Sequence, residues 1–210
     1  MKPAVLDLLA TLMSYFLLGL IRVLTGSQAR WWGCPPKAEQ RIYFANHQSH
    51  ADLVMIWAAL PKELRRNTRA VAARDYWTKT PFKQWLTSAV FNVIYVSRER
   101  HAEEDPLEPL IDAMNDGDSL ILFPEGTRGY ADEPQAFKAG LYNLALKFPE
   151  VELVPAWINN VQRVMPKGEV VPVPVLCSVT FGIPMKVQPG EDRQAFLTRA
   201  RSAVIALRDV

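Results

Sequence analysis

The order of apolar and polar positions along the chain predicts strands and helices that alternate. Short apolar runs bounded by polar residues, glycine or proline predict strands at 41–45, 69–73, 91–96, 119–123, 151–158 and 175–181. Helical periodicity and helix start and stop signals predict helices at 52–60, 75–88, 106–116, 137–148 and 192–207, the second of them broken near Pro81. This alternation is typical of an α/β fold, a single layered domain in which helices flank a mostly parallel or mixed sheet.

The first thirty residues form a separate pattern. Residues 4–24 are largely apolar, but the uncharged stretch 8–21 is shorter than the roughly 20 residues of a membrane-spanning helix. Its polar residues recur at helical spacing as one narrow stripe. We therefore expect residues 1–30 to form an apolar helix in the lipid interface; a short transmembrane anchor, an uncleaved signal-like segment and ordinary core packing are the alternatives. Arg30 to Pro36, rich in tryptophan and proline, is expected to anchor and connect this helix to one globular domain, residues 31–210.

Composition and charge narrow the function classes. With 210 residues, of which 49% are hydrophobic and 22% charged, and a net charge of +2, the chain is neither disordered nor a strongly basic nucleic-acid binder. Basic residues gather between Lys62 and Lys83, which indicates a surface for anionic lipid headgroups or an acidic acyl carrier, or else a solvated helical face. Cys34 and Cys177 form no CxxC pair, so the sequence predicts neither a disulfide framework nor a cysteine metal site.

The first loop with candidate catalytic residues follows the predicted strand 41–45 and runs from Asn46 to Asp52 (NHQSHAD). Its last four residues match a helix capping box with Ser49 as N-cap, so His47 is expected to precede the helix and to fold back onto the Asp52 carboxylate. Such a partner fixes the tautomer of an imidazole and raises its basicity, as a general base toward an alcohol requires. On spacing alone, an aspartate that merely caps the helix beside a polar loop histidine is an equal alternative.

A second loop, Phe123 to Arg128 (FPEGTR), follows the predicted strand 119–123. It combines a guanidinium, a flexible glycine and hydroxyl and amide donors directly after a buried strand. The planar fork of an arginine matches phosphate, and glycine lets the backbone approach a ligand. The pattern indicates a site for an oxyanion or a phosphate, with a surface turn as the alternative. Ligand sites in such sheets lie beyond the carboxyl ends of the strands, where both loops begin.

Taken in order, these motifs resemble those of the glycerolipid acyltransferases typified by 1-acylglycerol-3-phosphate acyltransferase. Asn46-His47, followed by four residues and Asp52, matches the first block of that family, and FPEGTR matches the third block without a mismatch. Residues 154–158 (VPAWI) resemble the Val-Pro block that follows, and residues 137–140 (FKAG) resemble the lysine-glycine start of a helix. The resemblance covers roughly residues 38 to 185.

The second block of the family is only partly present. Arg98 is retained, but Asn92 and Ser97 stand where the family favours a glycine and an aspartate. This departure bears on the identity of the acceptor more than on the type of reaction.

The resemblance implies direct acyl transfer, in which His47 deprotonates the acceptor hydroxyl, Asp52 orients His47, and the alkoxide attacks an acyl thioester. The implied donor is acyl-CoA or acyl carrier protein, and no cofactor or metal is implied. The implied acceptor is a lysophospholipid, in the first place 1-acylglycerol-3-phosphate, which gives phosphatidic acid, or another hydroxylated lipid. Glu125 is expected to hold Arg98, Arg128 or a glycerol hydroxyl. The substrate-binding residues implied are Asn46, Arg98, Glu125, Gly126, Thr127 and Arg128. The membrane bilayer is a further expected partner, at its cytoplasmic face and, in a bacterium, at the inner membrane.

Two hypotheses from other classes compete with acyl transfer. A metal-dependent hydrolase would use His47, His50 and Asp52 as ligands, but it needs more ligands, and His101, the third histidine, lies in an acidic polar stretch. A non-catalytic lipid-binding module would keep the fold for membrane recruitment and would need no base. A serine hydrolase is disfavoured, because the chain has no G-x-S-x-G elbow.

Overall fold

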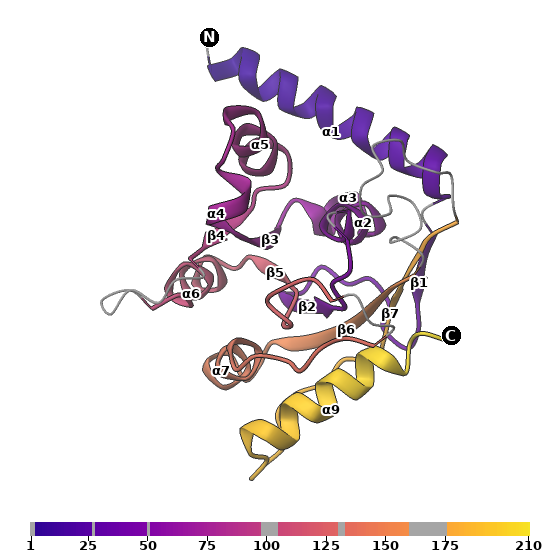
Figure 1. Ribbon diagram of the computed structural model, residues 1–210, viewed down its shortest axis with the longest axis vertical. Coiled ribbons are helices and arrows are strands. Elements are labelled where there is room, and N and C mark those ends of the chain that lie inside the picture. Colours follow the sequence, from indigo (N-terminus) through magenta and orange to yellow (C-terminus); the bar gives the residue numbers. More distant parts are fainter. Residues whose placement is uncertain (1–2, 27, 50, 98–104, 130–132, 160–175) are drawn as a thin grey trace.

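The computed structural model describes residues 3–26, 28–49, 51–97, 105–129, 133–159 and 176–210, which form an α/β domain around one mixed sheet (Figure 1). The seven strands within these residues lie in the order β1-β7-β6-β2-β5-β3-β4. Strands β6, β2, β5, β3 and β4 run parallel to their neighbours, whereas β7 is antiparallel to β6, and β1 pairs with β7 in parallel. Their bounds are β1 Gln28–Trp31, β2 Arg41–Ala45, β3 Thr68–Ala73, β4 Ile94–Val96, β5 Ser119–Leu122, β6 Glu152–Asn159 and β7 Ser178–Phe181.

Helices cover both faces of the sheet. Successive side chains of a strand point to opposite faces, and on β2 both sets of side chains are buried. On β2, Tyr43 and Ala45 belong to a core cluster that includes residues of α1 and α2, whereas Ile42 and Phe44 belong to a second cluster with residues of α6, α7 and α9. Figure 1 shows α1 and α2 on one side of the sheet and α7 and α9 on the other. The described helices are α1 Pro3–Thr25, α2 Asp52–Ala59, α3 Lys62–Arg65, α4 Arg74–Trp77, α5 Pro81–Trp85, the π-helix η1 Leu86–Val90, α6 Glu108–Asn115, α7 Gly140–Lys147 and α9 Arg193–Ile205.

Most predicted elements are present, but the short helix α3 was not predicted, and two further differences stand out. Each of the six predicted strands overlaps an observed one, but the helix predicted over 75–88 is divided into α4, α5 and η1, with α5 beginning at Pro81. Strand β1 was not predicted either, and it lies partly in the segment interpreted as a connector. β1 is an edge strand with mostly exposed side chains, and Trp31 stacks on Phe181 at 4.2 Å between ring centroids. An edge strand of this kind lacks the apolar run that identifies a buried strand.

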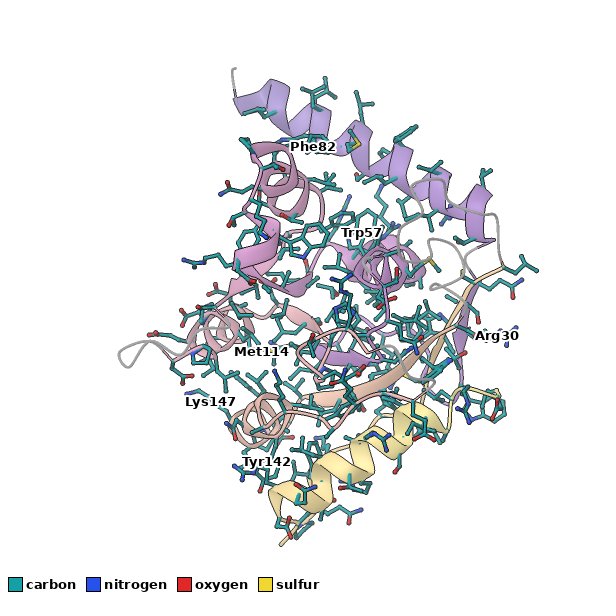
Figure 2. The ribbon with its side chains drawn as sticks, viewed as in Figure 1. Arg30, Trp57, Phe82, Met114, Tyr142 and Lys147 are labelled. Atoms are coloured by element: carbon teal, nitrogen blue, oxygen red, sulfur yellow. The ribbon has the colours of Figure 1, made fainter. Side chains whose placement is uncertain are left out.

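Helix α1 buries one face and exposes another that is also apolar. Ala10 is buried, and Met13, Leu17, Leu18 and Ile21 are partly buried against the core. Side chains on the other side project away from the molecule (Figure 2). The large exposed ones are Leu6, Leu8, Leu9, Leu12, Tyr15, Phe16, Leu20 and Val23. None of the helices in the described ranges is both long enough and apolar enough to cross a membrane.

Candidate active site

The two loops singled out in the sequence meet at one edge of the sheet. Strands β2 and β5 are parallel neighbours, and Phe44 lies opposite Leu122 near their carboxyl ends. The loop Asn46–Asp52 and the loop Phe123–Arg128 therefore leave the sheet side by side. The expected convergence of the two loops is confirmed.

His47 and Asp52 form the pair at the centre of this site. The Nδ1 atom of His47 lies 2.9 Å from Oδ2 of Asp52, and the two side chains are 20% and 2% exposed. The same oxygen accepts the backbone N–H groups of Gln48 and Ser49, both at 2.7 Å. A carboxylate is only an acceptor, so Nδ1 of His47 carries the hydrogen and the lone pair of the ring resides on Nε2.

The predicted capping box is formed only in half. The Asp52 carboxylate reaches back to the N–H of Ser49, as predicted, but the Ser49 hydroxyl accepts from Ala51 at 3.2 Å instead of capping Asp52. Helix α2 begins at Asp52 itself, so the prediction of Ser49 as its N-cap is wrong. The more important expectation, that His47 precedes the helix, is confirmed. His50, which lies between His47 and Asp52 in the sequence, is outside the described residues.

The second loop holds the main chain of His47 on both sides. Glu125 Oε1 accepts the N–H of His47 at 2.7 Å, and the N–H of Gly129 donates to the carbonyl of His47 at 2.8 Å. The other carboxylate oxygen of Glu125, Oε2, accepts the N–H of Gln135 at 2.7 Å. Glu125 is only 2% exposed, and this burial raises the pKa of its carboxyl, against the opposing effect of the two backbone hydrogen bonds.

These contacts give Glu125 a role that the sequence analysis missed. The expectation was that it holds Arg98, Arg128 or a glycerol hydroxyl, whereas its two oxygens accept main-chain N–H groups of His47 and Gln135. Arg98 lies outside the described residues. Nothing in the FPEGTR motif indicates from sequence alone that the side chain of Glu125 points into the protein.

The ring of His47 is also fixed by packing. It stacks on Phe123 with 4.4 Å between ring centroids and 22° between the planes. Together with the bond to Asp52, this contact leaves the imidazole little freedom to rotate. Phe123 is therefore a positioning residue that the sequence analysis placed in the motif but did not connect to His47.

The buried side chain of Asn46 joins the end of β2 to β6 by hydrogen bonds. Its amide Nδ2 donates to the carbonyl of Ile158 at 3.1 Å, and its Oδ1 accepts the N–H of Ile158 at 2.8 Å. The side chain is 1% exposed, so it ties the end of β2 to β6 from inside the protein. This structural role was not predicted, and the predicted contact of Asn46 with substrate stays a prediction.

Gly126 lets a cation lie across the second loop. Its φ of 70° falls in the left-handed region, and its N–H closes a turn onto the carbonyl of Phe123 at 2.9 Å. A Cβ at this position would lie 2.6 Å from Nζ of Lys138, so the lysine passes directly over the glycine. Thr127 is exposed and Arg128 partly exposed in the same loop. Lys138 and Arg128 thus contribute two positive charges at this loop.

The metal-dependent alternative finds no support in the described part of the chain. No three histidine, cysteine or acidic side chains there lie close enough together to hold a metal ion. His50 and His101, which that hypothesis also considered, lie outside the described residues.

Comparison with known proteins gives matches that span both loops of this site. A family model described as "Acyltransferase" matches residues 35–159, which include both loops. Among curated proteins, a 1-acyl-sn-glycerol-3-phosphate acyltransferase of Chlamydomonas reinhardtii is 27% identical over 64% of this chain and 39% of its own length. The protein of the same name from Cocos nucifera is 32% identical over 60% of this chain and 42% of its own length. The chain thus spans about two fifths of these relatives.

A solved structure shows that the fold is shared. The crystal structure of the 1-acyl-sn-glycerophosphate (LPA) acyltransferase from Thermotoga maritima matches with a TM-score of 0.72 and 20% sequence identity. The match covers 99% of this chain and 82% of the other. The α/β fold with a mixed sheet is therefore confirmed, and the resemblance drawn from the motifs is confirmed by the family model.

Proposed function

Because the chain belongs to the acyltransferase family, we propose that it transfers a fatty acyl group from an acyl thioester to the hydroxyl of a lysophospholipid, with His47 as general base. The observation that carries this proposal is the bond between Nδ1 of His47 and the buried Asp52, at 2.9 Å. This bond turns the basic Nε2 away from helix α2 and places the negative charge of Asp52 at the Nδ1 side of the ring.

The proposed reaction needs one base and no acyl-enzyme. Nε2 of His47 takes the proton of the acceptor hydroxyl while the oxygen attacks the thioester carbonyl. The C–S bond of the resulting tetrahedral intermediate then breaks, and the leaving thiolate takes the proton back from the imidazolium. Asp52 stabilises the imidazolium between the two steps. A base of this kind typically contributes 10²–10⁴-fold to the rate.

The positive charges of Lys138 and Arg128 favour a phosphorylated acceptor. Lys138 lies over Gly126, and Arg128 belongs to the same loop, so a phosphate bound at this loop would meet two positive charges. The buried Glu125 has both oxygens on backbone N–H groups and is not turned toward such a ligand. We propose 1-acylglycerol-3-phosphate as acceptor and phosphatidic acid as product, with another hydroxylated lipid as the alternative. The donor is acyl-CoA or acyl carrier protein.

The bilayer is the proposed source of the acceptor. The exposed side chains Leu8, Leu12, Phe16 and Val23 form an apolar face on α1 that no other part of the described chain covers. A helix with such a face lies in the interface between headgroups and acyl chains. We propose that α1 holds the domain against the cytoplasmic face of a membrane, which is the inner membrane in a bacterium.

The test compares purified protein with His47→Ala and His47→Gln. Each is incubated with acyl-CoA or acyl carrier protein donors and with a panel of lysolipids, and products are identified by mass. Both variants should lose acyl transfer by at least a hundredfold and should melt near the wild type. A variant that keeps more than about a tenth of the activity would exclude His47 as the base, since a general base contributes at least 10².

The competing hypotheses give different results in the same experiment. A lipid-binding module binds vesicles but forms no acyl product with any donor, and its binding is unchanged in His47→Ala. A metal-dependent hydrolase contains stoichiometric zinc that is lost in His47→Ala. For the acceptor, Arg128→Ala should raise KM for 1-acylglycerol-3-phosphate but not for an unphosphorylated monoacylglycerol.

A further inference from the structure

Arg201 on helix α9 bonds to the Glu133–Pro134 segment, which follows the second loop in the chain. Arg201 donates from Nε to the carbonyl of Pro134 at 2.8 Å and from Nη2 to Oε2 of Glu133 at 2.9 Å. The helix that carries it is well anchored, because Phe196 and Val204 are fully buried against the sheet. Figure 1 shows α9 along the face of the sheet opposite α1. Arg201 therefore fixes the Glu133–Pro134 segment relative to the core.

The segment that Arg201 holds is bonded in turn to Glu125 of the second loop. Gln135, the next residue, donates its N–H to Oε2 of Glu125 at 2.7 Å. The other oxygen of Glu125 accepts the N–H of His47 at 2.7 Å. An unbroken series of hydrogen bonds and one peptide link thus connects the guanidinium of α9 with the main chain of the proposed base.

The middle of this series is sensitive to small displacements. Glu125 is 2% exposed, so water cannot replace a lost donor on either carboxylate oxygen. If Gln135 moves away, Oε2 loses its N–H partner, and the carboxylate is free to turn and to release His47. Catalytic side chains must be held within about 0.5 Å of their working position, so such a shift lowers the rate of the chemical step.

We propose that Arg201 is a positioning residue of the active site, which acts through Pro134, Gln135 and Glu125 to fix the main chain of His47. This inference rests on the proposed function, since it assigns Arg201 to the same base. It predicts an effect on the chemical step and little effect on substrate affinity, because Arg201 contacts neither loop where substrate would bind.

The chain provides a closely matched control on the same helix. Arg199 donates from Nε and Nη2 to the carboxylate of Glu191, at 2.7 and 2.6 Å, and from Nη2 to the carbonyl of Lys186 at 2.8 Å. Like Arg201, it joins a carboxylate and a backbone carbonyl to α9, and its side chain is 33% exposed, as is that of Arg201. Its partners belong to the 186–191 segment and not to the site. A purely structural effect on α9 should appear equally in both variants.

The experiment measures acyl transfer by the 210-residue chain and by its variants Arg201→Ala, Arg201→Lys and Arg199→Ala. Arg201→Ala should lower kcat about tenfold and change KM for either substrate less than twofold. Arg201→Lys should recover only part of kcat, because an ammonium cannot place two donors on Pro134 and Glu133 as the planar guanidinium does. Arg199→Ala should keep the wild-type kcat. Equal losses in the two alanine variants, or an unchanged kcat in Arg201→Ala, would overturn the proposal.

Hydrogen exchange gives a second readout that does not depend on activity. In Arg201→Ala, the amides of His47 and Gln135 should exchange faster than in the wild type, whereas Arg199→Ala should leave them unchanged. Unchanged exchange in Arg201→Ala would refute the series of contacts even if kcat falls. If the wild type transfers no acyl group to any acceptor, the proposed function fails, and the exchange data alone still decide whether Arg201 positions His47.

Discussion

Replacement of Asp52 by asparagine removes one charge and almost no volume from the site. Oδ2 of Asp52 accepts from Nδ1 of His47 and from the N–H groups of Gln48 and Ser49. An amide oxygen carries no net charge and is a weaker acceptor than a carboxylate oxygen, so all three hydrogen bonds weaken. Because the position is 2% exposed, this weakening should cost about 1–3 kcal/mol of folding free energy.

The effect on catalysis should be larger than the effect on stability. In the transition state the His47 ring becomes an imidazolium, and in Asp52→Asn no carboxylate lies behind it. Leaving a buried charge without its partner costs about 3–5 kcal/mol, and each 1.36 kcal/mol is tenfold in rate. The expected loss in kcat is therefore on the order of 10²–10⁴.

The assay is kcat at saturating donor and acceptor, together with urea unfolding of the same samples. Asp192→Asn is the control, because Oδ1 of Asp192 also accepts two backbone N–H groups, at 2.7 and 2.9 Å, as the N-cap of α9. Asparagine is as good an N-cap as aspartate, so this variant should keep both stability and kcat. A folded Asp52→Asn protein with kcat within tenfold of the wild type would show that Asp52 does not support the imidazolium.

Two further predictions concern the second loop and α1. Gly126→Ala should lower the free energy of unfolding by about 1–2 kcal/mol, because it forces a side chain into the left-handed region and displaces Lys138; unchanged urea unfolding would contradict this. The double variant Leu12→Ser and Phe16→Ser should lower partitioning onto anionic vesicles at least tenfold, since each exposed side chain contributes up to about 1.5–3 kcal/mol when buried in lipid. Leu146→Ser, at an exposed leucine on α7, should bind vesicles like the wild type; an equal loss there would argue against α1 as the docking face.

The sequence is informative about the fold wherever a strand is buried on both faces. Residues 41–45 and 119–122 are fully buried, and their apolar runs identified them almost to the residue. β1 escaped notice because three of its four side chains are exposed, so that its place in the sheet depends on backbone pairing with β7. Backbone hydrogen bonds carry no side-chain pattern, and an edge strand held mainly by them is hard to identify from sequence.

For the site, contacts between residues close in the sequence could be predicted, whereas contacts between distant residues could not. The pairing of His47 with Asp52 joins residues five apart, and the loop geometry before a helix offered it as one of two equal alternatives. The bond between Glu125 and the N–H of His47 joins residues 78 apart, and it depends on which way a buried carboxylate turns. The stacking of Phe123 on His47 is of the same kind. Motifs identified the residues, but only the folded chain shows which of them support the base.

The position of Glu125 resolves a difficulty that its motif presents. A carboxylate beside a phosphate site repels the ligand, yet FPEGTR places one between the strand and the cations. In the structure the negative charge is buried, and both oxygens are bound to N–H groups of His47 and Gln135. The carboxylate therefore holds the base in place while its charge is partly offset by two main-chain dipoles. Arg128 of the same loop and Lys138, which passes over Gly126, remain accessible and are the residues that we propose attract the acceptor. In the proposed function, one short segment thus positions the base from inside the protein and attracts the acceptor from outside.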